Sequence, residues 1–316
     1  MYYIGLDIGG TKCASSLGKI ENGNIEILKK EKFLTDNQNP FVILDKFSSF
    51  IEECLTEYTI SGIGISCGGP LDSKKGIVMS PPSLPLWDNI KVVDYFENRF
   101  NIPTKLQNDA NAGAIAEWKY GAGKGFDNIV FITFGTGFGA GVISGGRLLI
   151  GANDNFGEIG HVRLTKKGPV GYNKEGSIEG YCSGSGIKRL AKILYEKELK
   201  KGHKSDYIEQ YGIDNVGAKL LADGYRAGDW FSKKVYKTSG KMLGQSLSIV
   251  IDILNPNAII MGGIFMRSGD LLIKEAKKVI VKETLPNSRK VCKILPAKLG
   301  ENIGDYAALV VATGDY

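Results

Sequence analysis

Apolar residues recur along the chain in two spacings, one typical of strands and one typical of helices. Three short strand-like runs open the sequence, and they are joined by the turn signals Gly9-Gly10-Thr11 and Glu21-Asn22-Gly23. Apolar residues three and four positions apart then predict a helix over 41–58. We expect strands at 2–8, 12–19, 24–32, 63–66 and 103–106, and a second helix at 92–100.

A second set of elements begins after a glycine-rich join at 121–125. Both halves open with a strand, a glycine-rich turn and another strand, at 4–17 and 131–143, which indicates a duplicated fold. We expect strands at 129–134, 140–143, 147–150 and 258–261, helices at 179–201, 216–227 and 230–254, and then helix, strand and helix to the end.

Composition is that of an ordinary globular protein. With 316 residues, 43% of them hydrophobic, the chain can bury a large core, and its length predicts two domains. No apolar run approaches a membrane span and the start lacks a signal-peptide pattern, so we expect a cytoplasmic protein without a membrane partner. The formal charge of +6 suits anionic ligands such as phosphates. Lysines dominate the stretch 188–204, which we interpret as a solvated helix face rather than a nucleic-acid surface.

Cysteine and histidine usage excludes several kinds of site. The five cysteines are scattered and form no CxxC pair, as in reduced cytosolic proteins. Only His161 and His203 are present, which excludes a site built from several histidines.

Two glycine-rich turns are candidate phosphate-binding loops, Gly9-Gly10-Thr11-Lys12 and Gly135-Thr136-Gly137. The stretch 135–141 partly fits a dinucleotide fingerprint, but that motif needs a helix next, and here a strand and a turn follow. No GxxxxGK[ST] sequence occurs either. We therefore exclude NAD and a P-loop, and favour phosphate binding by backbone N–H groups.

Carboxylates stand beside the first turn and at a strand–helix join. Asp7 ends the first strand, where it either caps the turn or holds Mg²⁺ through water. Asn108 and Asp109 precede a helical stretch, and both residue types are favoured N-caps. Asp109 is thus either the cap of its helix or a group that does chemistry.

A second group of polar residues lies in the later half. Glu158 and His161 are close enough in sequence to point into one pocket, although a surface Glu beside a packed His is the commoner outcome. Glu179 lies at a predicted helix start, where a carboxylate is also expected electrostatically. These three residues alone do not indicate a functional site, and we interpret them only together with the other motifs.

The motifs occur in an order that resembles one known family. DIGGTK at 7–12, NDANAG at 108–113, GTGFGAG at 135–141 and GEIGH at 157–161 are similar to the ROK family of repressors, open reading frames and sugar kinases. NPNAIIMGGI at 255–264 resembles the family's late adenosine-side strand and loop. Each motif alone is modest, but the ordered set covers most of the chain and is highly specific.

The resemblance implies an actin-like, ribonuclease-H-like duplicated α/β fold with a cleft between two lobes. The first lobe would cover 1–118, hold the sugar and the catalytic group, and be completed by the C-terminal helix 303–316. The second lobe would cover 119–302, hold the nucleotide and supply a homodimer interface.

The implied activity is phosphoryl transfer from Mg·ATP to a hexose, at its 6-hydroxyl. Asp109 would cap its helix and also take the proton from this hydroxyl, and Asp7 would hold Mg²⁺ through water. The other implied sugar contacts are Gly69, Asn108, Glu158, His161 and Glu179. The implied nucleotide contacts are Gly9, Gly10, Thr11, Lys12, Gly135, Thr136, Gly137, Gly262 and Gly263.

The sequence departs from the family at two places. The three cysteines of the family's zinc motif fall on Val170, Tyr172 and Ser177, so we expect no zinc. The loop that shapes the sugar pocket in many members contains Pro-Asn-Leu, and here it reads Pro82-Ser83-Leu84. The substrate therefore stays open between glucose, N-acetylmannosamine, another hexose and a β-glucoside, and the donor between ATP and polyphosphate.

The alternative is a non-catalytic sugar-sensing regulator. Regulators of this family carry an N-terminal helix-turn-helix domain, whereas the first strand here starts at Tyr2, so we expect no DNA-reading domain and no nucleic-acid partner. Asp109 and the two phosphate loops favour the kinase.

Overall fold

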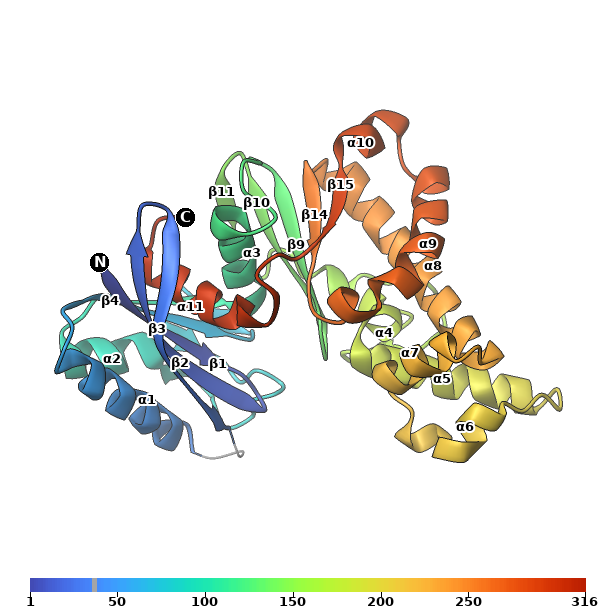
Figure 1. Ribbon diagram of the computed structural model, residues 1–316, viewed down its shortest axis with the longest axis horizontal. Coiled ribbons are helices and arrows are strands. Elements are labelled where there is room, and N and C mark those ends of the chain that lie inside the picture. The colour runs from blue at the N-terminus through green and yellow to red at the C-terminus, as the bar shows by residue number, and fades with distance from the viewer. Residues whose placement is uncertain (36–38) are drawn as a thin grey trace. The chain divides into compact units, whose positions relative to one another are not determined.

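The computed structural model describes residues 1–35 and 39–316 (Figure 1). Its internal contacts divide the chain into two compact units: Met1–Phe131 with Gly141–Gly157 and Ala297–Tyr316, and Ile132–Ala140 with Glu158–Pro296. These units and the predicted lobes differ over 119–131, 141–157 and 297–302. The lobe boundaries stay a prediction.

A five-stranded sheet with the order β3-β2-β1-β4-β8 forms the centre of the first unit. β1 (Tyr2–Ile8), β2 (Lys12–Glu21) and β3 (Asn24–Leu34) form an antiparallel meander. β4 (Ile60–Cys67) runs parallel to β1, and β8 (Thr104–Asn108) runs parallel to β4. All five predicted strands are confirmed, and four of them extend one to three residues beyond at least one predicted end.

Two helices, α1 (Pro40–Leu55) and α2 (Val92–Phe100), pack their apolar residues against this sheet. Phe47 of α1 and Phe96 of α2 are fully buried in one cluster with Ile4 of β1. The predicted bounds of α2 are confirmed, and α1 is one residue longer at its start and three residues shorter at its end than predicted. Asn39 sets the start of α1, because its side chain accepts a hydrogen bond from the Phe41 amide.

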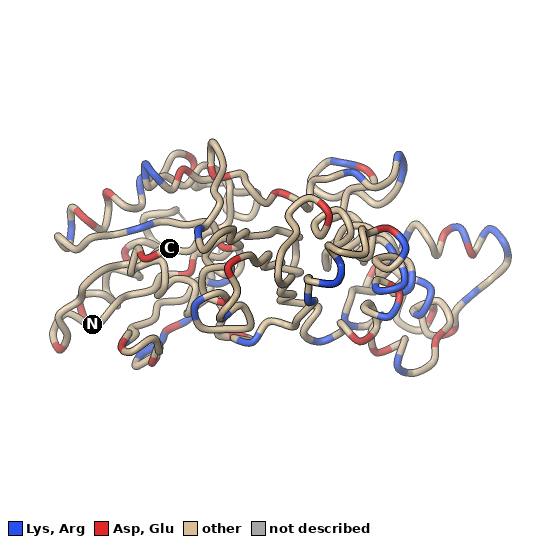
Figure 2. Tube along the Cα trace, turned by 90° about the horizontal axis from the view of Figure 1, so that it is seen from above, with Lys and Arg blue, Asp and Glu red and all other residues tan. Residues whose placement is uncertain are grey.

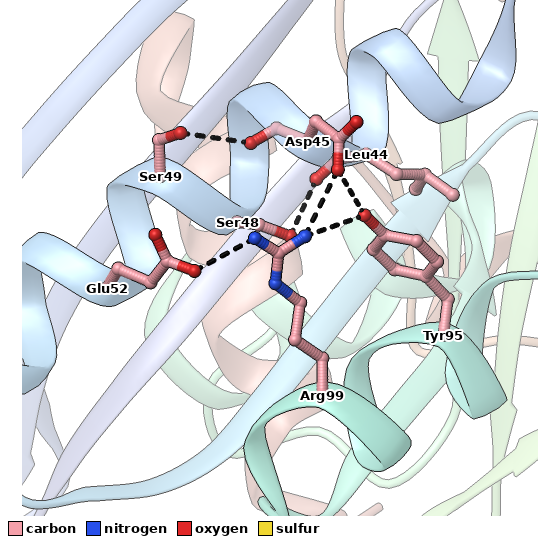
Figure 3. A network of polar contacts seen from close by, with 7 residues as sticks. All are labelled: Leu44, Asp45, Ser48, Ser49, Glu52, Tyr95 and Arg99. Carbon is pink, nitrogen blue, oxygen red and sulfur yellow. Dashed lines mark hydrogen bonds and ion pairs between the residues drawn. The ribbon is translucent and has the colours of Figure 1, made fainter.

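A polar network joins α1 to α2 on the surface of the first unit (Figure 3). Arg99 donates to Asp45 at 3.1 Å and to Glu52 at 2.9 Å, and the Tyr95 hydroxyl donates to Asp45 at 2.6 Å. The Tyr95 hydroxyl, followed by Arg99, lowers the pKa of Asp45. Because these charged side chains are largely exposed, the network adds little to stability.

Glycines in the sheet let α11 (Ile303–Thr313) approach its strands closely. A Cβ atom on Gly64 would lie 2.1 Å from the Ala308 carbonyl oxygen, and one on Gly5 would lie 2.9 Å from the Leu309 nitrogen. Gly18 meets the Leu309 side chain in the same way, at 2.6 Å. A larger residue at Gly5 or Gly64 would meet the backbone of α11, so these two glycines fix its position, whereas the Leu309 side chain could shift away from a larger residue at Gly18.

A second five-stranded sheet has the order β11-β10-β9-β14-β15. Both sheets thus have their first three strands in reverse order, followed by two later strands, which confirms the predicted duplication. The division between the units passes within β9 and β10. The strands of this sheet are β9 (Ile129–Phe134), β10 (Phe138–Ser144), β11 (Arg147–Leu149), β14 (Ala258–Met261) and β15 (Lys293–Pro296).

Helices make up most of the second unit. The predicted helix over 179–201 is wrong in one respect, because it is broken at Ser183, whose side chain accepts a hydrogen bond from the Gly186 amide and starts a new helix. The helix over 230–254 is confirmed, and Asp229 caps it through the Ser232 amide. The described helices of this unit are α4 (Ile178–Cys182), α5 (Gly184–Leu199), α6 (Asp206–Tyr211), α7 (Ala218–Arg226), α8 (Trp230–Leu254), α9 (Ile264–Glu283) and α10 (Pro286–Val291).

The remaining elements include one α-helix and several short strands. α3 (Asp109–Tyr120) follows β8 in the first unit. A three-stranded sheet joins β5 (Leu71–Asp72), β6 (Ile77–Val78) and β7 (Ile90–Lys91), and a hairpin joins β12 (Val170–Gly171) to β13 (Lys174–Glu175). In the described ranges 1–35 and 39–316, no helix combines the length and apolarity that spanning a bilayer requires.

Candidate functional site

The carboxyl ends of β1, β4 and β8 gather polar residues in the first unit. Asp7 near the end of β1 pairs in register with Ser66 of β4, whose side chain hydrogen-bonds to it. Asn108 at the end of β8 lies opposite Cys67 of β4. Gly69 follows β4, and a Cβ atom on it would lie 3.3 Å from the side-chain Nδ2 atom of Asn108. Four predicted site residues, Asp7, Gly69, Asn108 and Asp109, therefore lie at the same edge of the sheet.

Asn108, and not Asp109, is the N-cap of α3. The Asn108 Oδ1 atom accepts hydrogen bonds from the amides of Ala110 at 2.9 Å and Asn111 at 3.3 Å. The extended backbone of Asn108 suits the cap position, which makes Asp109 the first helical residue. The prediction that Asp109 caps its helix is wrong for this reason. Asp109 uses only Oδ1, towards the Ala110 amide at 2.8 Å, and among the described residues nothing donates to Oδ2.

Both aspartates are held in surroundings that disfavour their charge. Asp109 is exposed at the surface, yet the protein around its carboxyl displaces enough water to raise its pKa, and the Ala110 amide opposes this. Burial raises the pKa of Asp7 to about 7, and Asp109 adds to the shift. A raised pKa makes a carboxylate a better proton acceptor, and Asp109 also has an oxygen that accepts no hydrogen bond from the described residues.

The donor chemistry of this edge fits Mg²⁺. Mg²⁺ prefers oxygen ligands and is commonly bound through one or two carboxylates, with water and substrate phosphates completing its shell. Asp7 and Asp109 are close enough that the charge of Asp109 raises the pKa of Asp7. Asp7, with Asp109 nearby, could hold the ion through its water ligands.

The first phosphate-loop candidate lies between β1 and β2. Gly9 accepts a hydrogen bond from the Thr35 hydroxyl at 2.6 Å, which fixes the turn to the end of β3. A Cβ atom on Gly10 would lie 2.3 Å from the Ser83 side chain, so only glycine permits this approach. Thr11 and Lys12 are exposed at the tip of the turn. Ser83, the residue at which the loop departs from the family pattern, therefore contacts the phosphate-loop candidate.

In the second unit, three predicted stretches meet around Phe138. The Phe138 amide donates to the Glu179 Oε2 atom at 3.2 Å, and a Cβ atom on Gly137 would lie 3.0 Å from the same oxygen. A Cβ atom on Gly160 would lie 2.0 Å from the Phe138 carbonyl oxygen, which brings the turn with Glu158 and His161 to this strand. Glu179, Glu158 and His161 are thus brought to the loop Gly135–Gly137, whose Thr136 is exposed.

The remaining nucleotide candidates lie beside the same loop. Gly262 donates to the Ile132 carbonyl at 2.9 Å, and Gly263 has a φ of +63° and approaches the Phe134 carbonyl. The Gly184 amide donates to the Gly135 carbonyl at 2.8 Å, which joins the start of α5 to the loop. Gly135–Gly137, Gly262 and Gly263 therefore form one glycine-lined corner within the second unit.

The loop at the position of the zinc motif that many ROK proteins carry is held here by hydrogen bonds. β12 and β13 form a hairpin, and the Ser177 hydroxyl donates to the Gly171 carbonyl at 3.3 Å and accepts from the Gly180 amide at 3.2 Å. The His161 ring packs edge-on against Tyr172 at 5.7 Å. Within 1–35 and 39–316, no cluster of three or more His, Cys, Asp or Glu side chains could hold a metal ion. The absence of zinc stays a prediction.

Sequence reasoning missed several residues at the first-unit edge. Ser66 could have been found, since it precedes the end of a strand parallel to the one that carries Asp7. Lys30 of β3 and Asp305 of α11 form an ion pair beside Asp7, and no sequence pattern connects residues so far apart.

Comparisons with known proteins agree with the family resemblance and with the fold. Residues 3–314 match the ROK family. The glucokinase of Thermotoga maritima is 32% identical over 305 residues, which are 95% of this chain and 94% of that protein. The xylose repressor of Bacillus spizizenii is 29% identical over 307 residues, or 95% of this chain and 74% of the repressor.

A solved relative has the same fold over its whole length. The ROK family glucokinase from Streptomyces griseus, determined in complex with glucose and AMPPNP, superposes with a TM-score of 0.80 at 28% identity. The superposition covers 99% of this chain and 100% of that one. The predicted actin-like, ribonuclease-H-like fold is confirmed.

Proposed function

The chain belongs to the ROK family, and from this premise we propose that it is an ATP-dependent sugar kinase that phosphorylates a hexose at its 6-hydroxyl. One observation carries the proposal furthest: Asp109 begins α3 with an unused carboxylate oxygen and a raised pKa, at the sheet edge where Asp7 also lies. Glucokinase relatives, one of them solved with glucose and AMPPNP, support the same conclusion.

Asp109 is the proposed general base. Its Oδ2 atom takes the proton of the sugar hydroxyl, while Oδ1 stays fixed to the Ala110 amide. A modest base is sufficient, because phosphoryl transfer depends mainly on positioning and charge neutralisation. Asp7 would hold a Mg²⁺ ion through water, and this ion would supply positive charge to offset that of the donor's phosphate oxygens.

The other roles divide by ligand. The proposed sugar contacts are Gly69, Asn108, Glu158, His161 and Glu179. The exposed turns with Thr11, Lys12 and Thr136 and the glycine-lined corner with Gly262 and Gly263 are the proposed nucleotide contacts. Their backbone N–H groups suit phosphate oxygens.

The test is an ADP-release assay over a panel of sugars, with ATP as donor and a direct sugar-phosphate readout for polyphosphate. Glucose, mannose, N-acetylmannosamine and a β-glucoside are compared, and the product is identified by NMR. We expect one hexose to be phosphorylated at O6 with ATP.

Asp109→Asn should lower kcat by about 10²–10⁴-fold while sugar binding, measured by calorimetry, persists. Asp94→Asn, an exposed carboxylate of α2, is the matched control. Near-normal turnover in Asp109→Asn would show that the base is another residue.

A sugar-sensing regulator is the second candidate, and the similarity to a xylose repressor favours it. A regulator would bind a sugar without releasing ADP. Electrophoretic mobility shift with promoter DNA separates the candidates, since the kinase should leave the DNA unshifted at protein concentrations that saturate the sugar site.

A further inference from the structure

A partly buried ion pair lies next to Asp7 in the first unit. Lys30 projects from β3 and Asp305 from the first turn of α11, and the Lys30 ammonium donates to the Asp305 carboxylate. The Asp305 side chain is only 4% exposed and that of Lys30 is 23% exposed. Taking two charges out of water costs about as much as the pair returns, so stability alone does not explain its presence.

The position of α11 brings this pair to the proposed metal ligand. A Cβ atom on Gly304 would lie 2.6 Å from the Asp7 Oδ2 atom, and Asp305 is the next residue. Lys30 and Asp305 are both close enough to Asp7 to shift its pKa, Asp305 upwards and Lys30 downwards. The Lys30 ammonium therefore has two carboxylates near it, that of Asp305, with which it pairs, and that of Asp7.

An ammonium in this place has two uses that exclude each other. Paired with Asp7, it would occupy the oxygens that the water shell of Mg²⁺ needs. Paired with Asp305, it leaves those oxygens available and still offsets part of the negative charge around them. The structure has the second arrangement, because the ion pair joins Lys30 to Asp305.

We propose that Asp305 is a positioning residue that holds the Lys30 ammonium away from Asp7, so that Asp7 stays available to the hydrated metal ion of the nucleotide. This inference rests on the proposed kinase function. It gives the two partners unequal roles. Loss of Asp305 frees a competing cation, whereas loss of Lys30 removes the competitor.

The test is direct binding of Mn²⁺, as a spectroscopic substitute for Mg²⁺, in the presence of ADP, followed by electron paramagnetic resonance. We expect Asp305→Asn to raise the Kd of Mn²⁺ at least about fivefold, because the freed ammonium pairs with Asp7. Lys30→Met should not raise it. The double variant Lys30→Met/Asp305→Asn should return to within about twofold of the wild type, because it lacks both charges.

Two exposed residues provide matched controls: Lys32→Met on β3 and Glu301→Gln just before α11 should leave the Kd unchanged. A merely structural ion pair would lower the urea midpoint in both single variants without separating their Mn²⁺ affinities. Equal weakening by Asp305→Asn and Lys30→Met, or no weakening by Asp305→Asn, overturns the inference. If Asp305→Asn does not fold, the Lys30→Met variant alone tests the inference. Weaker Mn²⁺ binding by Lys30→Met would then contradict it. Wild-type protein that fails to bind Mn·ADP would instead refute the proposed function itself.

Discussion

Asp7 stands where burial and two other carboxylates oppose its ionisation, and burial is the larger cause. Its pKa is raised from 3.8 to about 7, so between these pH values the folded protein binds a proton that the unfolded chain has released. The contribution of Asp7 to the free energy of unfolding is therefore complete below pH 4 and falls as the pH rises towards 7.

Replacing Asp7 should remove this pH dependence. We expect Asp7→Asn, relative to the wild type without divalent metal, to gain about 1–3 kcal/mol in unfolding free energy between pH 5 and pH 8. Urea denaturation at the two pH values measures the change. The exposed carboxylate variant Asp94→Asn should show no such difference. An Asp7→Asn difference that is the same at both pH values would mean that Asp7 ionises freely in the folded protein.

Zinc content is a second residue-level prediction. A structural zinc site needs about four ligands, usually thiolates or imidazoles, and Val170, Tyr172 and Ser177 stand at the three expected cysteine positions. We expect tag-free protein to contain no zinc by mass spectrometry and to keep its activity after strong chelation once Mg²⁺ is restored. About one tightly held zinc per chain would contradict this.

Single functional residues can be predicted from the sequence when they belong to short motifs. They cannot be predicted when their role depends on contacts with residues far away in the sequence. Asp109 and Asn108 are adjacent to a strand–helix join, so both could be selected, although their order as cap and first helical residue needed coordinates. Lys30 is one of several lysines in β3, and only the packing of α11 distinguishes it.

Glu117 ties three segments of the first unit together. It is fully buried near the end of α3 and accepts hydrogen bonds from the amides of Ala122 at 2.7 Å, Lys298 at 2.9 Å and Leu299 at 2.8 Å. The turn after α3 and the segment that leads into α11 are thereby held by one carboxylate.

Glu117→Gln should destabilise the protein by about 1–3 kcal/mol, because the amide group of glutamine would face a backbone N–H group and leave it unpaired. Chemical denaturation followed by tryptophan fluorescence measures the loss. Glu196→Gln, on the exposed face of α5, is the control and should change little. Equal stability of the two variants would show that the buried carboxylate can be replaced without cost.

Elements with strong periodicity or a clear cap could be predicted from the sequence. The bounds of α8 follow from Asp229 at its start and a left-handed Asn255 at its end. The break between α4 and α5 could not be predicted, because a serine within a helical pattern caps a new helix only when the chain turns there. The short α10 before β15 was missed because its sequence buries none of its side chains.

Charge is divided unequally over the whole molecule (Figure 2). The second unit contains 25 Lys and Arg residues against 14 Asp and Glu residues, a formal charge of +11, whereas the first has 15 against 20, or −5. The unit with the proposed adenosine-side loops is thus the positive one. Such a field attracts an anionic nucleotide and is screened by salt.

Raising the ionic strength should therefore weaken nucleotide binding selectively. We expect KM for ATP to rise at least about threefold between roughly 20 and 300 mM salt, while KM for an uncharged sugar stays constant. Steady-state kinetics with both substrates in one salt series provides the internal control. A parallel rise of both KM values would point to a general loss of structure instead.

The two-part α/β architecture is the level at which the sequence was most informative, because the repeated strand, glycine turn and strand of each half needs only local pattern. The predicted homodimer stays a prediction, and light scattering of the purified protein tests it. Sequence reasoning could not assign 141–157 and 297–302 to the first unit, because that depends on contacts between distant segments.

The glycines beneath α11 also set an order of events during synthesis. Gly5, Gly18 and Gly64 leave a channel in the first sheet that residues of α11 fill. The last strand of that sheet ends at Asn108, whereas α11 begins at Ile303. At a translation rate of about 5–20 residues per second, α11 is synthesised roughly 10–40 s after the last strand of the sheet. Throughout this interval the first sheet of the nascent chain lacks the helix that covers it at Gly5, Gly18 and Gly64. The first unit can therefore complete its packing only after α11 has been synthesised.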